Sequence, residues 1–391
     1  MKSIHLCAAA ALFVTPAFAQ SNAELEAKIE AMAAELESLQ LQGVMPAVGE
    51  SEYGLGPAAS KVYSKEQGLS IGGYGEARLR MDDANDFDWY RHIMYFGYKF
   101  DEHWVLNTEV ELEHVKEVFV EFAYLDYLGV TENMNLRMGL MLNPMGIINE
   151  YHEPTTYLAA NRSQTESVII PSTWRENGVG VFGELNGFDY KLYYMTGLDG
   201  AGFKEDSLRS GRQKGAEAMA EDFAMVASLN YVDIPGVRIG GSIYSGDSGQ
   251  NQFDTLDDNG TEDTGDDTLA SIGSCATDII EFHAEYKSGP FWARAMYANA
   301  EVSDAFDNGL ALDIDLTGTY YELGYNLMAD SDASLYPFFR QEELDLSGSE
   351  KSITTYGLHY RPIDQIVFKL DVTDDDSKDG DTTSFVIGYV F

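Results

Sequence analysis

The chain has few of the residues that anchor or cross-link proteins in common ways. It holds two cysteines, Cys7 and Cys275, and we expect Cys7 to be removed with a targeting segment, so neither an intrachain disulfide nor a cysteine metal site is predicted. After Gln20, no run of about eighteen apolar residues occurs, which excludes a membrane-spanning helix. A membrane protein of this sequence must therefore be a closed barrel.

Basic residues are also scarce. The 391 residues include 25 Lys and Arg against 65 Asp and Glu, for a net charge of −40. This charge excludes nucleic acid and anionic membrane surfaces as electrostatic partners. The chain is rich instead in Gly, Tyr and Phe (37, 24 and 20 residues), a composition that alternating strands joined by Gly-containing turns produce.

Residues 1–19 have the layout of a cleaved secretory signal. Lys2 precedes an apolar run, and Ala17-Phe18-Ala19 precedes Gln20 as a small-residue cleavage site. We therefore expect export, and a mature chain that starts at Gln20.

One stretch, residues 20–42, has a helical pattern. Its apolar residues are spaced by alternating fours and threes, as in a coiled coil: Leu25, Ile29, Met32, Leu36 and Leu39. Fewer than three heptads are marginal alone, so we expect a periplasmic stalk that forms a homotrimer; a solvated helical spacer is the alternative. Residues 43–68 contain Gly and Pro and are expected to be a flexible linker.

Residues 69–391 form about sixteen segments of alternating polarity. Short connections regularly follow the even-numbered segments, and the long ones, 144–175, 199–221, 246–277 and 302–315, follow odd-numbered segments. This asymmetry predicts an all-β fold, a transmembrane antiparallel β-barrel of about 16 strands with both ends on the short-turn side. The connection at 128–133 is longer than expected and that at 114–115 shorter, so counts of fourteen or eighteen remain open.

The last segment, residues 382–391, has Phe385, Ile387, Tyr389 and Phe391 on one face. A strand that ends on Phe resembles the closing strand of bacterial outer-membrane β-barrels. That resemblance implies recognition of Phe391 by the barrel assembly machinery, and contacts with outer-membrane lipid and lipopolysaccharide.

A barrel of this size leaves an aqueous lumen unless a segment folds into it. The third long-side loop, 144–175, carries apolar residues such as Ile147, Tyr157 and Ile170, which are unfavourable in a solvated loop. We expect it to fold into the lumen as a constriction; a loop lying over a subunit interface is the alternative.

The end of that loop carries a family resemblance. Residues 169–183, Ile-Ile-Pro-Ser-Thr-Trp-Arg-Glu-Asn-Gly-Val-Gly-Val-Phe-Gly, resemble the phosphate-selective (O/P-type) porin family. The resemblance implies a sixteen-stranded trimeric pore with an inward third loop. In that family selectivity rests on a ladder of basic residues, whereas here the inward positions mix basic and acidic side chains, so the resemblance supports the pore and leaves its substrate open.

The alternation and the third loop together give the residues expected to line the pore: Arg78, Arg80, Arg91, Lys99, Glu109, Glu111, Arg137, Glu150, His152, Arg162 and Arg175. Basic residues of the first, second and fifth strands, with Arg162 and Arg175, could face the acidic third and fourth strands and produce a transverse field. The alternative is that these charges pair across strands.

Two acidic loops contain weak candidates for Ca²⁺ ligands, Asp257, Asp258, Asp379 and Asp381. Neither completes an EF-hand pattern, so solvated loops are the preferred interpretation. No motif for catalysis occurs, and no cofactor is expected. The sequence thus predicts an outer-membrane porin for passive diffusion of small hydrophilic solutes. An anion-selective channel and a structural or adhesive barrel are the alternatives.

Overall fold

The computed structural model describes residues 51–82, 85–257, 268–271, 275–307 and 310–391. The expected signal, the coiled-coil positions and the first part of the expected linker lie outside these residues. Within them, no helix has the length and apolar character needed to cross a membrane.

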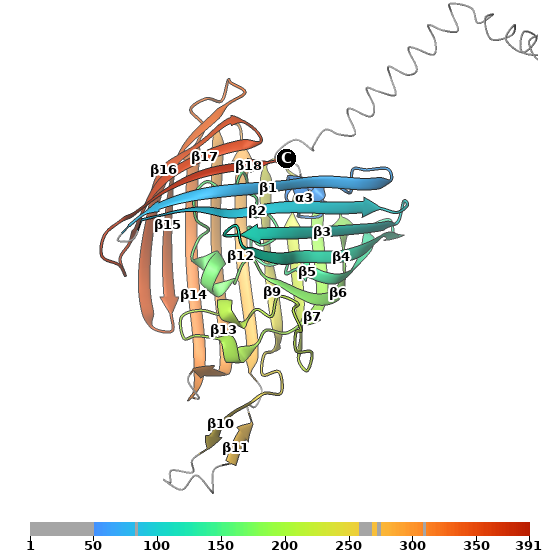
Figure 1. Ribbon diagram of the computed structural model, residues 1–391, viewed down its shortest axis with the longest axis vertical. Helices are drawn as coiled ribbons and strands as arrows, with labels where there is room; N and C mark the ends of the chain where they lie inside the picture. The colour runs from blue at the N-terminus through green and yellow to red at the C-terminus, as the bar shows by residue number, and fades with distance from the viewer. Residues whose placement is uncertain (1–50, 83–84, 258–267, 272–274, 308–309) are drawn as a thin grey trace, which may run out of the picture. The chain divides into compact units, whose positions relative to one another are not determined.

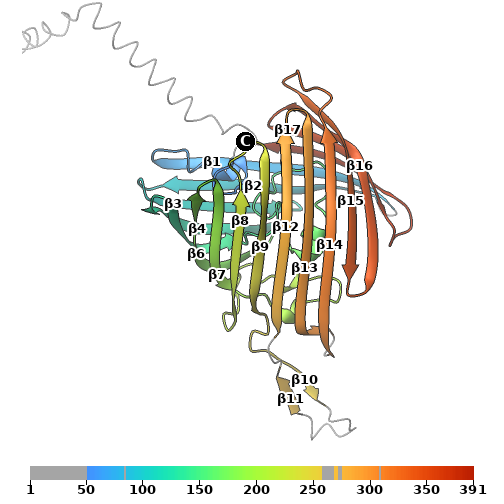
Figure 2. The ribbon, with the colours of Figure 1, turned by 180° about the vertical axis from the view of Figure 1, so that it is seen from behind.

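Sixteen of the described strands close into one antiparallel barrel (Figures 1 and 2), which confirms the predicted all-β barrel of about 16 strands. They are β1 (Gly68–Met81), β2 (Asp86–Lys99), β3 (Trp104–Glu113), β4 (Glu117–Thr131), β5 (Met134–Leu142), β6 (Arg175–Leu185), β7 (Phe188–Thr196), β8 (Phe223–Tyr231), β9 (Val237–Asp247), β12 (Ala276–Ser288), β13 (Phe291–Asp307), β14 (Leu310–Tyr325), β15 (Ser334–Leu346), β16 (Ser349–Ile363), β17 (Ile366–Asp375) and β18 (Thr382–Val390). Strands β10 (Phe253–Asp257) and β11 (Thr268–Ser271) pair separately between β9 and β12.

The seam between β1 and β18 is closed by the last residue of the chain. Tyr74 pairs with Val390, and Phe391 exchanges backbone hydrogen bonds of 2.8 and 2.9 Å with Gly73. The alternation predicted for β18 holds, since Val386 and Val390 are buried while Ile387 and Phe391 are 37% and 41% exposed on the outer face.

Connections differ on the two sides of the barrel. On the side of the barrel where β1 begins, the connections are short and comprise residues 100–103, 132–133, 186–187, 232–236, 289–290, 326–333 and 364–365. The other side carries the long loops 143–174, 197–222 and 248–275, which we call L3, L4 and L5. Two predictions about length were wrong. The expected loop 302–315 is largely strand, because β13 and β14 stay paired out to Asp307 and Leu310, and β4 extends to Thr131, which leaves a tight turn where 128–133 had been expected to be long.

The outer face of the barrel carries large apolar side chains, and aromatic pairs lie near its short-turn end. Neighbouring rings there have centroids 4.9 to 5.2 Å apart in the pairs Tyr98–Phe100, Trp104–Tyr127, Phe188–Tyr231 and Phe291–Tyr325. Tyr194 and Phe223 stack beside L4 at the opposite end. Aromatic residues in these positions form the interfacial girdles of barrels that span membranes.

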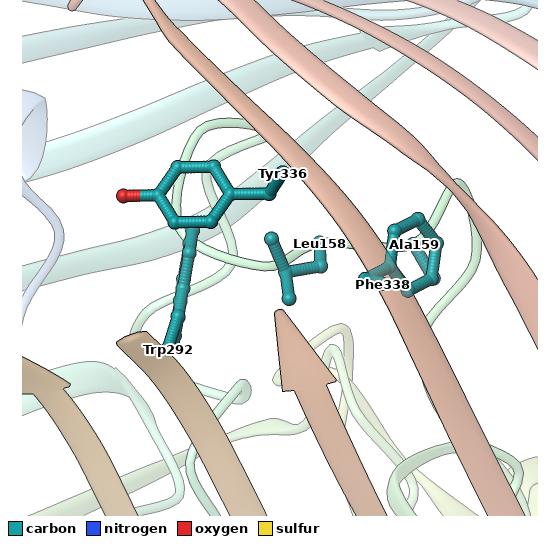
Figure 3. Close-up of a cluster of buried hydrophobic side chains, with 5 residues drawn as sticks. All are labelled: Leu158, Ala159, Trp292, Tyr336 and Phe338. Carbon is teal, nitrogen blue, oxygen red and sulfur yellow. The ribbon is translucent and has the colours of Figure 1, made fainter. Parts of the chain in front are cut away.

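L3 runs inside the barrel and contacts walls on both sides of the lumen. Leu158 and Ala159 are fully buried in a cluster with the inward-facing rings of Trp292, Tyr336 and Phe338 (Figure 3). Its backbone is also held by inward polar groups of the wall. The donor–acceptor distances are 2.9 Å from Lys369 Nζ to the Ala159 carbonyl and 2.9 Å from Arg340 Nη1 to the Asn161 carbonyl. The short π-helical turn η1 (Thr165–Ile169) belongs to this loop.

Residues 51–67, which we call the inner segment, differ from the flexible linker that their Gly and Pro content suggested. They include the helical turn α3 (Pro57–Ser60), drawn in blue beside β1 and β2 in Figure 1. Leu55, Val62 and Tyr63 are at most 6% exposed. Asn107 Nδ2 of β3 donates to the Ala59 carbonyl at 2.9 Å, so the segment lies against the inner wall. Apolar side chains spaced along this stretch therefore bind it inside the barrel.

Candidate functional site

The lumen contains a cavity of about 830 Å³ on the long-loop side. L3 borders it through Asn161, Arg162 and Gln164. Its other lining side chains come from strands far apart in the sequence and are mostly charged, among them Arg78, Arg80, Asp86, Asp88, Arg340, Glu342, Asp375 and Lys378. A second cavity of about 650 Å³ lies among the short turns and is lined by Tyr53 of the inner segment, Leu128, Glu132 and Glu184. L3 and the inner segment lie inside the barrel, between the two cavities.

Several charged side chains expected to line the pore are buried in ion pairs. Arg91 Nε lies 2.8 Å from Glu76 Oε1, and Arg137 Nε lies 2.9 Å from Asp126 Oδ1. Each of these four side chains is at most 2% exposed. The pairing corresponds to the second sequence interpretation, in which charges neutralise one another across neighbouring strands.

Two further expected residues are paired in the same way. Arg175 Nη1 lies 2.9 Å from Glu121 Oε1, and Lys191 of β7 forms an ion pair with Glu150 of L3. Lone charges at these depths would carry a desolvation penalty of several kcal/mol each. The strands therefore contribute few uncompensated charges here.

A basic cluster of L3 and L4 lacks such partners. Its members are Arg162, Arg209, Arg212 and Lys214, and with Arg175 they border a small cavity of about 60 Å³ whose opposite wall carries Glu111, Glu113 and Glu121. The guanidinium groups of Arg209 and Arg212 donate to the backbone carbonyls of Ser172 and Thr173. Within the part of the chain that the structure describes, neither has a carboxylate within 4.0 Å. The net charge of this wall is positive.

The basic residues of the cluster lower one another's pKa values. Burial first, and then the positive charge of neighbouring arginines, lowers the pKa of Arg212 and also that of Lys214. A cation whose pKa is lowered by other cations lies in a positive potential, which favours an anion. Sequence analysis missed Arg209, Arg212 and Lys214. The signal was the density of basic residues in 209–214, unusual for a chain of this acidity.

His152, Glu109 and Glu121 form a third arrangement. His152 comes from L3, while the carboxylates come from β3 and β4, and all three are at most 2% exposed. One ligand atom from each lies within 4.8 Å of the others. Two of these residues were expected to line the pore, but their convergence could not be read from the sequence.

The remaining predicted residues are dispersed. Arg80 pairs with Asp82 and Asp86 at the rim of the large cavity, and Lys99 Nζ donates to the Tyr63 carbonyl at 3.2 Å. Of the Ca²⁺ candidates, Asp379 and Asp381 are exposed and belong to no group of converging ligand atoms among the described residues. Asp258 and the side chain of Asp257 lie outside the described part.

Comparison with known proteins places the chain in a family. An uncharacterized protein of Aquifex aeolicus (strain VF5) is 32% identical over 382 residues, which cover 87% of this chain and 83% of that protein. The two chains belong to one family. No family model matches the sequence.

Solved structures with the same barrel are more distant in sequence. A loop-deletion mutant of OmpT, an outer membrane protein of Vibrio cholerae, superposes with a TM-score of 0.58 at 14% identity, covering 84% of this chain and all of that one. The outer membrane channel DcaP of Acinetobacter baumannii gives a TM-score of 0.54 at 10% identity, covering 83% and 97%. These likenesses establish a porin-type barrel fold. The narrower resemblance to phosphate-selective porins stays a prediction.

Proposed function

We propose that the protein is an outer-membrane channel of a Gram-negative bacterium, through which small hydrophilic solutes and ions diffuse passively. The observation that carries this proposal is the cavity of about 830 Å³ inside the barrel, lined by charged side chains. The apolar outer face and its aromatic pairs support placement in a membrane. The similar fold of DcaP, itself described as an outer membrane channel, agrees with this proposal.

The flux through the proposed channel is small and depends on L3. L3 and the inner segment narrow the lumen between the two cavities, so solutes pass only around their polar groups. Transport follows the concentration gradient and needs no cofactor. We further propose a homotrimer in contact with outer-membrane lipid and lipopolysaccharide, assembled by the machinery that recognises Phe391.

A preference for anions is the finer form of the proposal. It is favoured by the basic cluster, whose arginines donate to neutral carbonyl groups and retain their field. Because the strand arginines are already paired, this cluster dominates the local potential at the narrow part of the lumen. Phosphate is one candidate anion, and the sequence resemblance is the reason to test it.

The proposal is tested by recording currents through the purified, folded protein in a planar bilayer under a KCl gradient. We expect stepwise currents in threes, a reversal potential of anion-preferring sign, and block by added phosphate if the narrower form holds. Neutralising Arg209 and Arg212 to Gln should move the reversal potential toward cation preference. Lys204→Gln is the matched control, since Lys204 is an exposed cation of the same loop and lies outside the cavities described above.

A structural or adhesive barrel is the second candidate, because L3 and the inner segment occupy the lumen. Folded protein that gives no current steps under any voltage would favour this candidate over the channel. An enzyme is not proposed. The His side chains of the described residues hydrogen-bond to Tyr, carboxylate, amide or backbone groups, at Tyr389, Leu128, Asp88, Asn149, Glu281, Asn230 and Leu158, and none of these partners is a nucleophilic Ser or Cys.

A further inference from the structure

The cluster of Glu109, Glu121 and His152 is built by an irregularity of the sheet. Glu109 pairs with Phe122, but the next residue, Val110, pairs with Val120, so Glu121 is an extra residue in β4. Consecutive side chains of a strand normally point to opposite faces. Here Glu121 and Phe122 are both buried, at 1% and 0% exposure. The bulge therefore turns Glu121 inward beside Glu109, as bulges near functional sites often do.

The polar atoms that converge there lack hydrogen-bond partners among the described residues. Both carboxylate oxygens of Glu109, Oε2 of Glu121 and Nε2 of His152 are buried and make no hydrogen bond within that part of the chain. Nε2 of His152 lies 3.4 Å from Glu121 Oε2 and 3.6 Å from Glu109 Oε1. Most buried polar groups in proteins are hydrogen-bonded, so four unsatisfied atoms that face one another require a further group between them.

The orientation of His152 identifies the kind of group. Its Nδ1 lies 2.8 Å from the carbonyl oxygen of Asn149; a carbonyl only accepts, so Nδ1 carries a proton and donates. In the neutral ring, Nε2 then presents a lone pair to the two carboxylates. Metal-binding histidines are commonly held in this way, with the other ring nitrogen donating to a backbone carbonyl. Arg175 binds Glu121 Oε1 at 2.9 Å and leaves Oε2 available.

We propose that Glu109, Glu121 and His152 bind a divalent transition-metal ion of the Zn²⁺ type. A tetrahedral site with bonds of about 2.0 Å places its ligand atoms about 3.3 Å apart, close to the 3.4 and 3.6 Å from His152 to the two carboxylates. One imidazole and two carboxylates suit Zn²⁺ and its neighbours in the first transition series. Ca²⁺ needs six to eight oxygen ligands and fits poorly.

A small cavity adjoins one of the three ligands. The cavity of about 60 Å³ is lined by Glu121 but by neither Glu109 nor His152, and its volume accommodates a water molecule beside the Glu121 carboxylate. Because His152 belongs to L3 while the carboxylates belong to the wall, the metal joins the loop to β3 and β4. The site is independent of ion conduction, since it requires only the folded barrel.

The test uses the full-length protein folded in detergent, treated with EDTA and then titrated with ZnCl₂ against a chromophoric chelator. We expect one tight equivalent per chain and a rise in the thermal unfolding midpoint on adding Zn²⁺. Glu109→Gln and His152→Gln should each weaken binding by more than about 10-fold, since loss of even an outer-shell partner has an effect of that order. Folding of each variant is verified by heat-modifiable migration in gel electrophoresis.

His283→Gln is the matched control. His283 is also buried and adjoins a carboxylate, but both its ring nitrogens are hydrogen-bonded, at 2.8 Å to Glu281 Oε2 and 2.8 Å to Asn230 Oδ1. This variant should keep the tight equivalent. The proposal is overturned if EDTA-treated wild-type protein binds no tight Zn²⁺ and shows no change in midpoint, which would leave an imidazolium between two carboxylates. It is equally overturned if the two variants bind Zn²⁺ as tightly as the wild type, which would assign the metal to acidic outer loops.

Discussion

The inner segment should act as a removable obstruction, and Tyr63 is the residue through which to test this. Its hydroxyl group donates to Asp126 Oδ2 at 2.7 Å and accepts from Arg137 Nη2 at 3.0 Å. Its ring packs edge-on against Tyr53, with centroids 5.0 Å apart, and the residue is 6% exposed. Tyr63 is thus the main anchor of the segment on the wall.

The magnitude follows from what Tyr63→Ala removes. Truncating a buried aromatic side chain costs about 3 to 5 kcal/mol, and here the cost falls on the docked state of the segment. Asp126 and Arg137 remain paired to each other at 2.9 Å, so the wall keeps its own ion pair. At 1.4 kcal/mol per tenfold change, the ratio of docked to undocked segment should fall by about 10²- to 10⁴-fold. Tyr63→Phe loses only the hydroxyl contacts, which are to charged groups and are worth about 1.5 to 3 kcal/mol, and should give about a 10- to 150-fold change.

The assay is single-channel recording of the wild type and both variants in planar bilayers. Time spent in a higher-conductance state should rise in the order wild type, Tyr63→Phe, Tyr63→Ala. Glu66→Ala is the control, because Glu66 is an exposed residue of the same segment, and its currents should match the wild type. If folded Tyr63→Ala protein has the conductance and dwell times of the wild type, the inner segment does not limit the current and the reasoning is refuted.

Three further results are expected. Burial and neighbouring arginines lower the pKa of Lys214, so its charge is lost at a lower pH than that of an ordinary lysine. Anion preference, measured by reversal potential, should therefore fall as the pH rises through that range. Lys214→Met should remove this pH-dependent step. Arg137→Met leaves Asp126 buried and unpaired and should destabilise the barrel by about 3 to 5 kcal/mol in denaturant unfolding, whereas adding Asp126→Asn should restore part of the loss. Deleting Phe391 removes the two backbone hydrogen bonds at the seam and should lower the yield of heat-modifiable barrel in refolding, compared with Phe391→Tyr.

The wall of the barrel could be predicted because its signal is local. Side-chain direction alternates along a strand regardless of what lies elsewhere, so the last strand, predicted over 382–391, was placed within one residue of the observed β18 (Thr382–Val390). The outer part of the hairpin of β13 and β14 was missed because residues 302–315 had been assigned to a long loop. Asn308-Gly309, a dipeptide that favours a two-residue hairpin turn, was the better signal.

The contents of the lumen were harder to predict because they depend on tertiary contacts. Leu55 and Val62 lie in a stretch whose Gly and Pro suggest a flexible linker, and only the presence of the wall makes their burial favourable. Likewise, β4 does not alternate strictly, since Val118, Phe119 and Val120 are all apolar, and its sequence alone does not place the bulge at Glu121. The convergence of Glu121 with His152 of L3 requires the path of the loop. The predicted loop 144–175 nearly coincides with L3, residues 143–174, but the sequence did not indicate which of its side chains would meet which wall.

The net charge of −40 does not determine the potential inside this barrel. Arg91 and Arg137 are neutralised at close range by Glu76 and Asp126, and buried pairs of this kind contribute little field beyond their own neighbourhood. Exposed acidic residues such as Asp379 are screened by salt within about 10 Å. The field at the constriction therefore comes from charges that have no carboxylate partner among the described residues, and the half-buried arginines of L4 are such charges. The loops L3 and L4 thus set the local potential, while the strands provide its neutral, ion-paired surroundings.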